Sequence, residues 1–196
     1  MTNPHGVRAA FLDRDGVINV DTGYVGKRED FVFADGAQQA LARLSAAGYL
    51  LVIVTNQSGI ARGFYSEAAF VTLMDAVCRE LADMGAPVAK VMYCPHMPGD
   101  DCTCRKPRPG MILEAAADLE IDLAASIMVG DKPGDIEAGR AAGVGRCFLI
   151  GEGAAASGVV SDGNFLDLAK CVDSLLAGAA GPRIGTKTNR VSPEHG

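Results

Sequence analysis

The sequence predicts an α/β fold in which helices cover both faces of a doubly wound, Rossmann-like parallel sheet. Short apolar runs alternate along the chain with longer amphipathic stretches, which is the order of strands and helices in such folds. The apolar runs contain few polar residues, as is typical of strands that are buried on both faces. Polar and charged residues directly follow several of these runs, and α/β sheets bind their ligands at this end of the strands.

Five runs are expected to form strands. They are short, rich in β-branched and other apolar residues, and bounded by turn-forming residues. In chain order they are Ala9–Asp13, Leu50–Asn56, Val91–Cys94, Ser126–Asp131 and Arg146–Ile150.

Helices are expected after each strand, because an apolar stripe or an end signal marks each one. Ser, Thr, Asp and Asn favour a helix start, Pro favours the first turn, and Gly favours the position after the last turn. These signals are Gly48 after the first helix, Ser66 before and Gly85 after the second, Pro109 before the third, Pro133 before and Gly143 after the fourth, and an apolar stripe over Phe165–Leu176 for the last.

The 196 residues are expected to form one domain over residues 1–180. The chain is 48% hydrophobic, which is enough for a sizeable core, and no linker divides it. Residues 181–196 are polar and lose the helical periodicity, so a disordered tail is expected there.

The net charge and the length of the apolar runs indicate which classes of partner the protein is not expected to bind. The net charge of −6 argues against a general nucleic-acid binder, although several cations lie beside the polar motifs and suit a small anion. The longest apolar run, YLLVIV, is too short to cross a bilayer, and the N-terminal segment has no apolar signal core. We therefore expect a cytoplasmic protein without a nucleic-acid or membrane partner.

Two strand ends carry polar groups in the first third of the chain. Asp13 and Asp15 follow the first strand, and Gly16 would let the backbone turn both carboxylates toward one site. Thr55 ends the second strand in the sequence VTNQSG. Each motif alone has an ordinary alternative, since paired aspartates are common and Asn, Gln, Ser and Gly are usual turn residues.

Two further groups follow later strands. Lys106 comes soon after the third strand, and Asp131 and Asp135 follow the fourth in GDKPGD. A lysine here could be a solvated surface residue, and carboxylates in a helix's first turn often only complement its dipole. Such ordinary explanations do not account for the fact that the paired aspartates, Thr55, Lys106 and the second pair of aspartates each follow a predicted strand, in this order.

A cysteine cluster lies between the third strand and Lys106. Cys94, His96, Cys102 and Cys104 offer three thiolates and an imidazole, which suit tetrahedral Zn²⁺. Four protein ligands leave no open position, so a structural zinc loop over residues 94–104 is predicted. A reduced cysteine cluster or an iron site is the alternative.

The four strand-end groups together resemble the haloacid dehalogenase superfamily, and the surrounding segments resemble its histidinol-phosphate and heptose-bisphosphate phosphatases. The similarity runs from about Ala9 to Ile150. The segments that carry it are DRDGVIN, VTNQSGIARG, YCPH, CTCRKPRPGM and MVGDKPGDIEAG.

The resemblance implies a phosphoric monoester hydrolase that works through an aspartyl-phosphate. Asp13 would be the nucleophile and Asp15 the general acid and base. Thr55 would bind the phosphoryl oxygens and Lys106 would neutralise their charge.

The resemblance also implies Mg²⁺, because several carboxylates converge on a phosphate. The side chains of Asp13 and Asp131 and the backbone carbonyl of Asp15 would bind it. Asp135 is expected to orient these ligands or the helix instead of binding the metal directly.

Substrate recognition is expected from four parts of the chain, although residues 21–24 could equally form an ordinary turn. The residues are Asp21, Thr22, Gly23, Tyr24, Thr55, Asn56, Gln57, Ser58, Arg105, Lys106 and Lys132.

The substrate that the resemblance implies is the 7-phosphate of D-glycero-D-manno-heptose 1,7-bisphosphate, a precursor of bacterial cell-surface lipopolysaccharide. Histidinol phosphate is the alternative substrate, and a non-catalytic phosphate-binding protein is the alternative class. The short gaps between the motifs leave no room for a cap domain, and capless relatives suggest a monomer. Only MPGDD separates His96 from Cys102, so the zinc loop's reach over the site is expected to be short.

Overall fold

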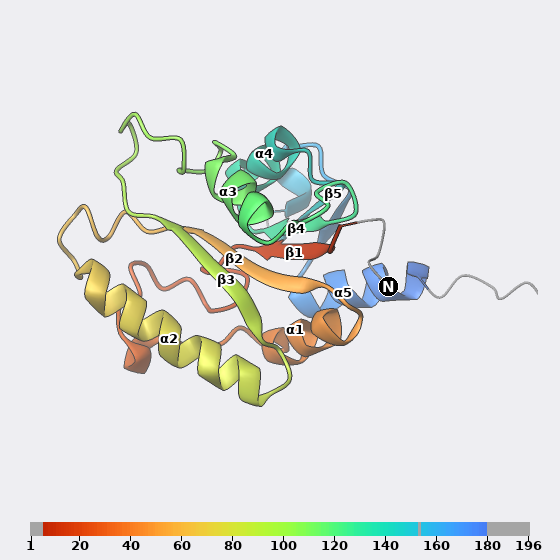
Figure 1. The fold of residues 1–196 in the computed structure, drawn as a ribbon, viewed down its shortest axis with the longest axis horizontal. Helices are drawn as coiled ribbons and strands as arrows, with labels where there is room; N and C mark the ends of the chain where they lie inside the picture. Colours follow the sequence, from red (N-terminus) through yellow and green to blue (C-terminus); the bar gives the residue numbers. More distant parts are fainter. Residues whose placement is uncertain (1–5, 153, 180–196) are drawn as a thin grey trace, which may run out of the picture.

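One six-stranded parallel sheet runs through the molecule, in the order β3-β2-β1-β4-β5-β6 (Figure 1). The strand order reverses between β1 and β4, and such a switch point opens a crevice at the carboxyl ends of the two strands. The strands are β1 (Ala9–Leu12), β2 (Leu50–Asn56), β3 (Val88–Cys94), β4 (Ile127–Gly130), β5 (Arg146–Ile150) and β6 (Gly163–Phe165).

The structure is a computed structural model that describes residues 6–152 and 154–179. It contains five α-helices and two short 3₁₀ segments within these ranges. They are α1 (Ala37–Ala46), α2 (Glu67–Asp83), α3 (Gly110–Asp118), α4 (Pro133–Ala142), α5 (Leu168–Ala179), η1 (Arg28–Asp30) and η2 (Ala154–Ala156).

The sheet separates two apolar cores. Helices α1, α2 and α5 cover one face, where Leu41, Phe70 and Val172 are buried against the strands (Figure 1). Helices α3 and α4 cover the other face, where Ile112 and Ile136 are buried. The predicted doubly wound fold is therefore confirmed, and burial on both faces explains why the central strands are continuously apolar.

The predicted elements differ from the structure mainly at the sheet edges. β3 begins three residues earlier than expected, at Val88, where its exposure alternates because it is an edge strand. The expected helix start at Phe165 is wrong, since Phe165 ends β6 and pairs with Ile150 of β5. β6 was missed because three residues, Gly, Asn and Phe, give too short a run for a strand signal.

The described residues leave the carboxyl ends of the central strands without a covering domain. The stretch from Asp15 to Thr55 contains η1 and α1, and the stretch from Thr55 to Lys106 contains α2, β3 and the cysteine loop. No helix in residues 6–152 or 154–179 is long and apolar enough to cross a membrane. The predicted tail, residues 181–196, lies outside the described ranges.

Ser66 caps α2 as expected. Its side chain accepts a hydrogen bond from the backbone N–H of Ala69 at 3.1 Å, which satisfies one of the free donors of the first turn.

We expect Ser66→Ala to lower the free energy of unfolding by about 1 kcal/mol, because that donor loses its protein acceptor. Chemical denaturation of both proteins measures the difference. Ser174→Ala, at an exposed position inside α5, is the control and should leave the unfolding free energy nearly unchanged. Equal effects of the two changes would contradict the capping role.

Candidate active site

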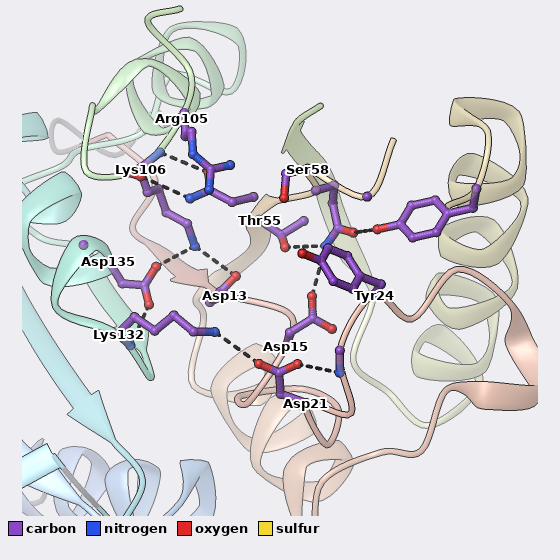
Figure 2. A pocket seen from close by; sticks show the side chains of 16 residues that line it. Asp13, Asp15, Asp21, Tyr24, Thr55, Ser58, Arg105, Lys106, Lys132 and Asp135 are labelled. Atoms are coloured by element: carbon purple, nitrogen blue, oxygen red, sulfur yellow. Dashed lines mark hydrogen bonds and ion pairs between the residues drawn. The ribbon is translucent and has the colours of Figure 1, made fainter. Parts of the chain in front are cut away.

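A cavity of about 490 Å³ lies at the carboxyl ends of β1 and β2 and is lined by most of the predicted site residues (Figure 2). Thr22 does not line it, and Asp131 lies beside it on the adjoining surface. The predicted residues that line it are Asp13, Asp15, Asp21, Gly23, Tyr24, Thr55, Asn56, Gln57, Ser58, Arg105, Lys106 and Lys132.

The chain turns sharply just after β1, where its backbone passes close to the side chain of Asp131. The N–H of Asp13 bonds to the Val129 carbonyl at 3.0 Å, which extends the pairing of β1 with β4. Gly16 then adopts a φ of +85°, and a Cβ there would lie 2.4 Å from Asp131 Oδ2. Glycine is therefore required both by the backbone angle and by the close approach of Asp131.

Lys106 is the buried cation of the site. Its Nζ lies 2.9 Å from Asp13 Oδ1 and 2.6 Å from Asp135 Oδ1 (Figure 2). It also donates to the Val54 carbonyl at 2.6 Å. Burial alone would lower the pKa of Lys106, but Asp13 and Asp135 outweigh that effect and hold the pKa above its usual value. The ammonium group therefore stays charged although the residue is only 6% exposed.

Asn56 fixes the backbone of Lys106. Its side-chain Nδ2 donates to the Lys106 carbonyl at 3.1 Å, and its Oδ1 accepts from the Lys106 N–H at 3.0 Å. Since Asn56 ends β2 and Lys106 follows the cysteine loop, this amide joins two segments that are fifty residues apart. Its side-chain polar atoms are thus engaged within the protein.

Three acidic side chains form a cluster that fits a divalent cation. Carboxylate oxygens of Asp13, Asp131 and Asp135 all lie within 4.8 Å of one another. Buried Asp131 Oδ1 accepts no hydrogen bond from the described residues. Burial raises the pKa of Asp131 to about 6, with Lys132 partly offsetting it, and burial likewise raises the pKa of Asp13. Mg²⁺ prefers hard oxygen ligands and would relieve this repulsion.

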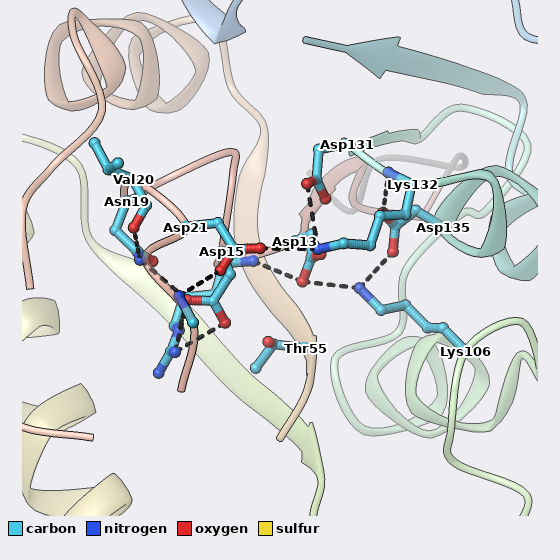
Figure 3. A network of polar contacts seen from close by, with 12 residues as sticks. Asp13, Asp15, Asn19, Val20, Asp21, Thr55, Lys106, Asp131, Lys132 and Asp135 are labelled. Atoms are coloured by element: carbon cyan, nitrogen blue, oxygen red, sulfur yellow. Dashed lines mark hydrogen bonds and ion pairs between the residues drawn. The ribbon is translucent and has the colours of Figure 1, made fainter. Parts of the chain in front are cut away.

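Asp15 has different surroundings from Asp13, although only one residue separates them. Arg14 contacts both its oxygens, with Nη2 at 2.7 and 2.8 Å, and Asn19 and Gln57 each donate a further hydrogen bond at 3.0 Å. Arg14 is 0% exposed, and Nη2 also donates to the Val25 carbonyl at 3.1 Å. In Figure 3, Asp15 and Asn19 lie on one side of Asp13, and Lys106 and Asp135 lie on the other.

The buried pairing of Arg14 with Asp15 was not predicted from the sequence, although Arg14 is one of the cations that lie beside the polar motifs. The available signal was its position between the two aspartates. Asn19 and Tyr65, four and fifty residues beyond Asp15, were also missed, because nothing in their sequence context distinguishes them from ordinary loop residues.

The rim of the cavity carries further charges. Lys132 Nζ lies 3.3 Å from carboxylate oxygens of both Asp21 and Asp131 (Figure 3). Asp21 also accepts from the Gly23 N–H at 3.0 Å, which closes the turn before Tyr24. Arg105 donates to the His96 carbonyl at 3.2 Å and so is tied to the cysteine loop.

The cysteine loop has the donor set and the spacing for zinc. Cys94 Sγ lies 3.4 Å from His96 Nδ1, 3.8 Å from Cys102 Sγ and 3.1 Å from Cys104 Sγ. All four ligand atoms lie within 4.8 Å of one another. Ligand bonds of ~2.0–2.3 Å in a tetrahedron place neighbouring ligand atoms about 3.5–3.8 Å apart, so the four residues fit Zn²⁺.

Comparison with known proteins agrees with this geometry. A family model described as HAD-hydrolase-like matches residues 103–176. The D-glycero-beta-D-manno-heptose-1,7-bisphosphate 7-phosphatase of Photorhabdus laumondii is 46% identical over 155 residues, which are 76% of this chain and 82% of the relative. The corresponding alpha enzyme of Burkholderia mallei is 50% identical over 150 residues, covering 73% and 79% of the two chains.

The chain belongs to the heptose-1,7-bisphosphate 7-phosphatase family.

This phosphatase therefore is a phosphoric monoester hydrolase of the haloacid dehalogenase superfamily. A solved structure of D,D-heptose 1,7-bisphosphate phosphatase from B. bronchiseptica, complexed with magnesium and phosphate, aligns with a TM-score of 0.80 and 38% identity. The alignment covers 87% of this chain and 99% of that one. Magnesium in that relative agrees with the carboxylate cluster found here, and the expected family and cofactors are confirmed.

The affinity of the metal-free phosphatase for Mg²⁺ should fall as the pH drops through about 6. The cation binds ionised carboxylates, and the raised pKa of Asp131 means that protons compete with it below that value. Competition from one proton makes the Kd about tenfold weaker near pH 5 than near pH 7.5. Isothermal titration calorimetry at the two pH values tests this, and equal affinities would contradict it.

Proposed function

We propose that this chain hydrolyses the 7-phosphate of D-glycero-D-manno-heptose 1,7-bisphosphate with Mg²⁺, through an aspartyl-phosphate on Asp13. The main supporting observation is the buried Asp13 carboxylate at the end of β1, with Lys106 2.9 Å away and two more carboxylates beside it in an open cavity. Relatives with that printed activity are 46–51% identical to the chain, which supports the choice of substrate.

Charge neutralisation is the central requirement of the reaction, because nucleophile and phosphate are both negative. Lys106 would contact the phosphoryl oxygens together with the hydroxyl of Thr55, which lies in the same cavity. Mg²⁺, held by Asp13, Asp131 and the backbone carbonyl of Asp15, would supply further positive charge when bound. Asp135 would keep Lys106 in place through its 2.6 Å ion pair.

Two steps would complete the hydrolysis. A carboxylate oxygen of Asp13 attacks phosphorus, the bond from phosphorus to the sugar oxygen breaks, and Asp15 donates a proton to that oxygen. Water then attacks the phosphorus of the aspartyl-phosphate while Asp15 takes its proton. The products are inorganic phosphate and the heptose 1-phosphate, and both aspartates return to their starting states.

The second phosphate of the substrate would be recognised at the rim. Arg105 and Lys132 are both cationic there, and neighbouring carboxylates hold the pKa of Lys132 above its usual value despite burial. The turn from Asp21 to Tyr24 would contact the sugar. Histidinol phosphate has only one phosphate, so two rim cations favour the bisphosphate.

The finer statements about the protein's setting are also proposals. We propose a cytoplasmic monomer that binds neither nucleic acid nor membrane, with one domain over residues 1–180. Support comes from the acidic net charge of −6 and from the six cysteines, none of which forms a disulfide, as suits a reducing compartment.

Phosphate release from heptose 1,7-bisphosphate and from histidinol phosphate, measured side by side with Mg²⁺, tests the substrate. We expect kcat/KM for the bisphosphate to be at least about 100-fold higher, which corresponds to about 2.7 kcal/mol of transition-state binding. Asp13→Asn should abolish both activities, because the amide is not a nucleophile for phosphorus. Activity retained by Asp13→Asn would contradict the proposed mechanism. Comparable activity of the wild-type protein on both compounds would contradict the proposed substrate.

Loss of zinc should weaken substrate binding more than it slows turnover. Arg105 is held by the carbonyl of His96, so Cys102→Ser, which removes one zinc ligand, should release it. We expect a lower melting temperature and a KM for the bisphosphate that rises several-fold, measured by steady-state kinetics. Cys78→Ser, on helix α2, is the control that changes a thiol outside the cluster. An unchanged KM after zinc loss would refute the link.

A further inference from the structure

Gln57 is almost completely buried although it borders the cavity, with 2% of its surface exposed. Its side-chain Nε2 donates to Asp15 Oδ2 at 3.0 Å and to Thr55 Oγ1 at 2.8 Å. Its Oε1 accepts from the hydroxyl of Tyr65 at 2.6 Å. Both amide hydrogens are therefore used inside the protein, and none remains to bind a substrate oxygen.

The chemistry of the partners fixes the orientation of this amide. Asp15 Oδ2 already accepts a hydrogen bond from Arg14 Nη2 at 2.8 Å, and an oxygen that accepts hydrogen bonds faces the NH₂ group of Gln57 and not its carbonyl oxygen. The Tyr65 hydroxyl then donates to the amide oxygen. Burial raises the pKa of Tyr65, with a smaller opposing effect of Arg14, so the hydroxyl keeps the proton that it donates.

Tyr65 is itself held in one position. Its ring lies between the backbones of Gly26 and Gly59, where an added Cβ would come within 2.4 Å and 2.6 Å of ring carbons. Gly26 follows the turn that carries Tyr24, and Gly59 follows Ser58. The ring thus packs against both loops that border the cavity, and its hydroxyl is directed at Gln57.

We propose that Gln57 is a positioning residue for the acid–base step and not a substrate contact, and that Tyr65 orients it. This inference rests on the proposed roles of Asp15 and Thr55. Arg14 contacts both oxygens of Asp15 and Asn19 contacts Oδ1, while Gln57, just after β2, adds a second donor to Oδ2 and so helps to set the plane of the carboxylate.

Gln57 has a second effect, on the hydroxyl of Thr55. Because Thr55 Oγ1 accepts from Gln57, the hydroxyl hydrogen is free to point at another acceptor, and a phosphoryl oxygen in the cavity would be one. Replacing Gln57 would therefore have two effects. It would impair the transfer of a proton from Asp15 to the leaving group, and it would weaken the contact of Thr55 with the phosphoryl group. Only the first effect depends on the leaving group.

The test compares two substrates that differ in their need for a proton. An alkyl phosphate such as heptose 1,7-bisphosphate has a basic leaving group, whereas p-nitrophenyl phosphate releases a stable phenolate. For Gln57→Leu we expect kcat/KM to fall about 30-fold or more on the alkyl phosphate and about fivefold or less on the aryl phosphate. Equal losses on both substrates, or no loss, would overturn the proposal.

Tyr65→Phe provides a milder variant that keeps the ring between the two glycines. It should lower kcat/KM on the alkyl phosphate about threefold to tenfold and leave the aryl phosphate nearly unchanged. The double variant should be no slower than Gln57→Leu alone, since Tyr65 acts through Gln57. Additive losses in the double variant would overturn the proposal that Tyr65 acts through Gln57. If Gln57→Leu does not fold, the comparison of the two substrates is made with Tyr65→Phe alone.

Tyr93→Phe is the matched control. It removes one tyrosine hydroxyl that donates to a side chain, Glu67 at 2.7 Å, and should change neither rate. If the wild-type chain does not hydrolyse heptose 1,7-bisphosphate, the proposed substrate fails. The positioning role is then tested in the same way with another primary-alkyl phosphate, such as fructose 1,6-bisphosphate.

Discussion

The contact between Lys106 and the two carboxylates of Asp13 and Asp135 is the constraint on which the site depends. It joins the end of β1, the start of α4 and the segment after the cysteine loop. A buried ammonium group is costly without charged partners, and buried carboxylates are equally costly without it. The three groups must therefore be brought together, and the side-chain amide of Asn56 does so by fixing the Lys106 backbone.

Asp13 and Asp15 have different surroundings, which suit the different roles proposed for them. Asp13 lies in a buried cluster of carboxylates, where burial raises its pKa and a metal ion would favour its ionised form. Asp15 is held by a guanidinium and two amides in a network of directed hydrogen bonds. Different surroundings of paired carboxylates are the usual means by which one site supplies both a nucleophile and an acid.

The sequence predicted the strand ends well because parallel strands bring their carboxyl ends to one edge, so Asp13, Thr55 and Lys106 had to meet there. It did not predict that Arg14 is buried or that Gln57 contacts Asp15 and Tyr65. Gln57 is 42 residues from Asp15 and 8 residues from Tyr65 in the sequence. These contacts depend on the directions in which side chains leave the loops, and the periodicity of the sequence does not encode those directions. The short edge strand β6 escaped for a related reason, since its pairing with β5 and not its composition makes it a strand.

The proposed role of the cysteine loop would link stability to recognition in a site that no cap domain covers within the described residues. Four ligands to one metal would leave zinc no chemistry of its own, but the loop's His96 carbonyl holds Arg105, and Lys106 follows directly. An open site lacks a lid that closes around the substrate, so its cations must be fixed beforehand. A metal-braced loop achieves this with few residues, because one ion replaces the packing that so short a segment cannot supply. The recognition of the substrate's far phosphate would then depend on rigid loops. The preference for this substrate over other phosphates would depend on how closely the charges of these loops match the spacing of its two phosphate groups.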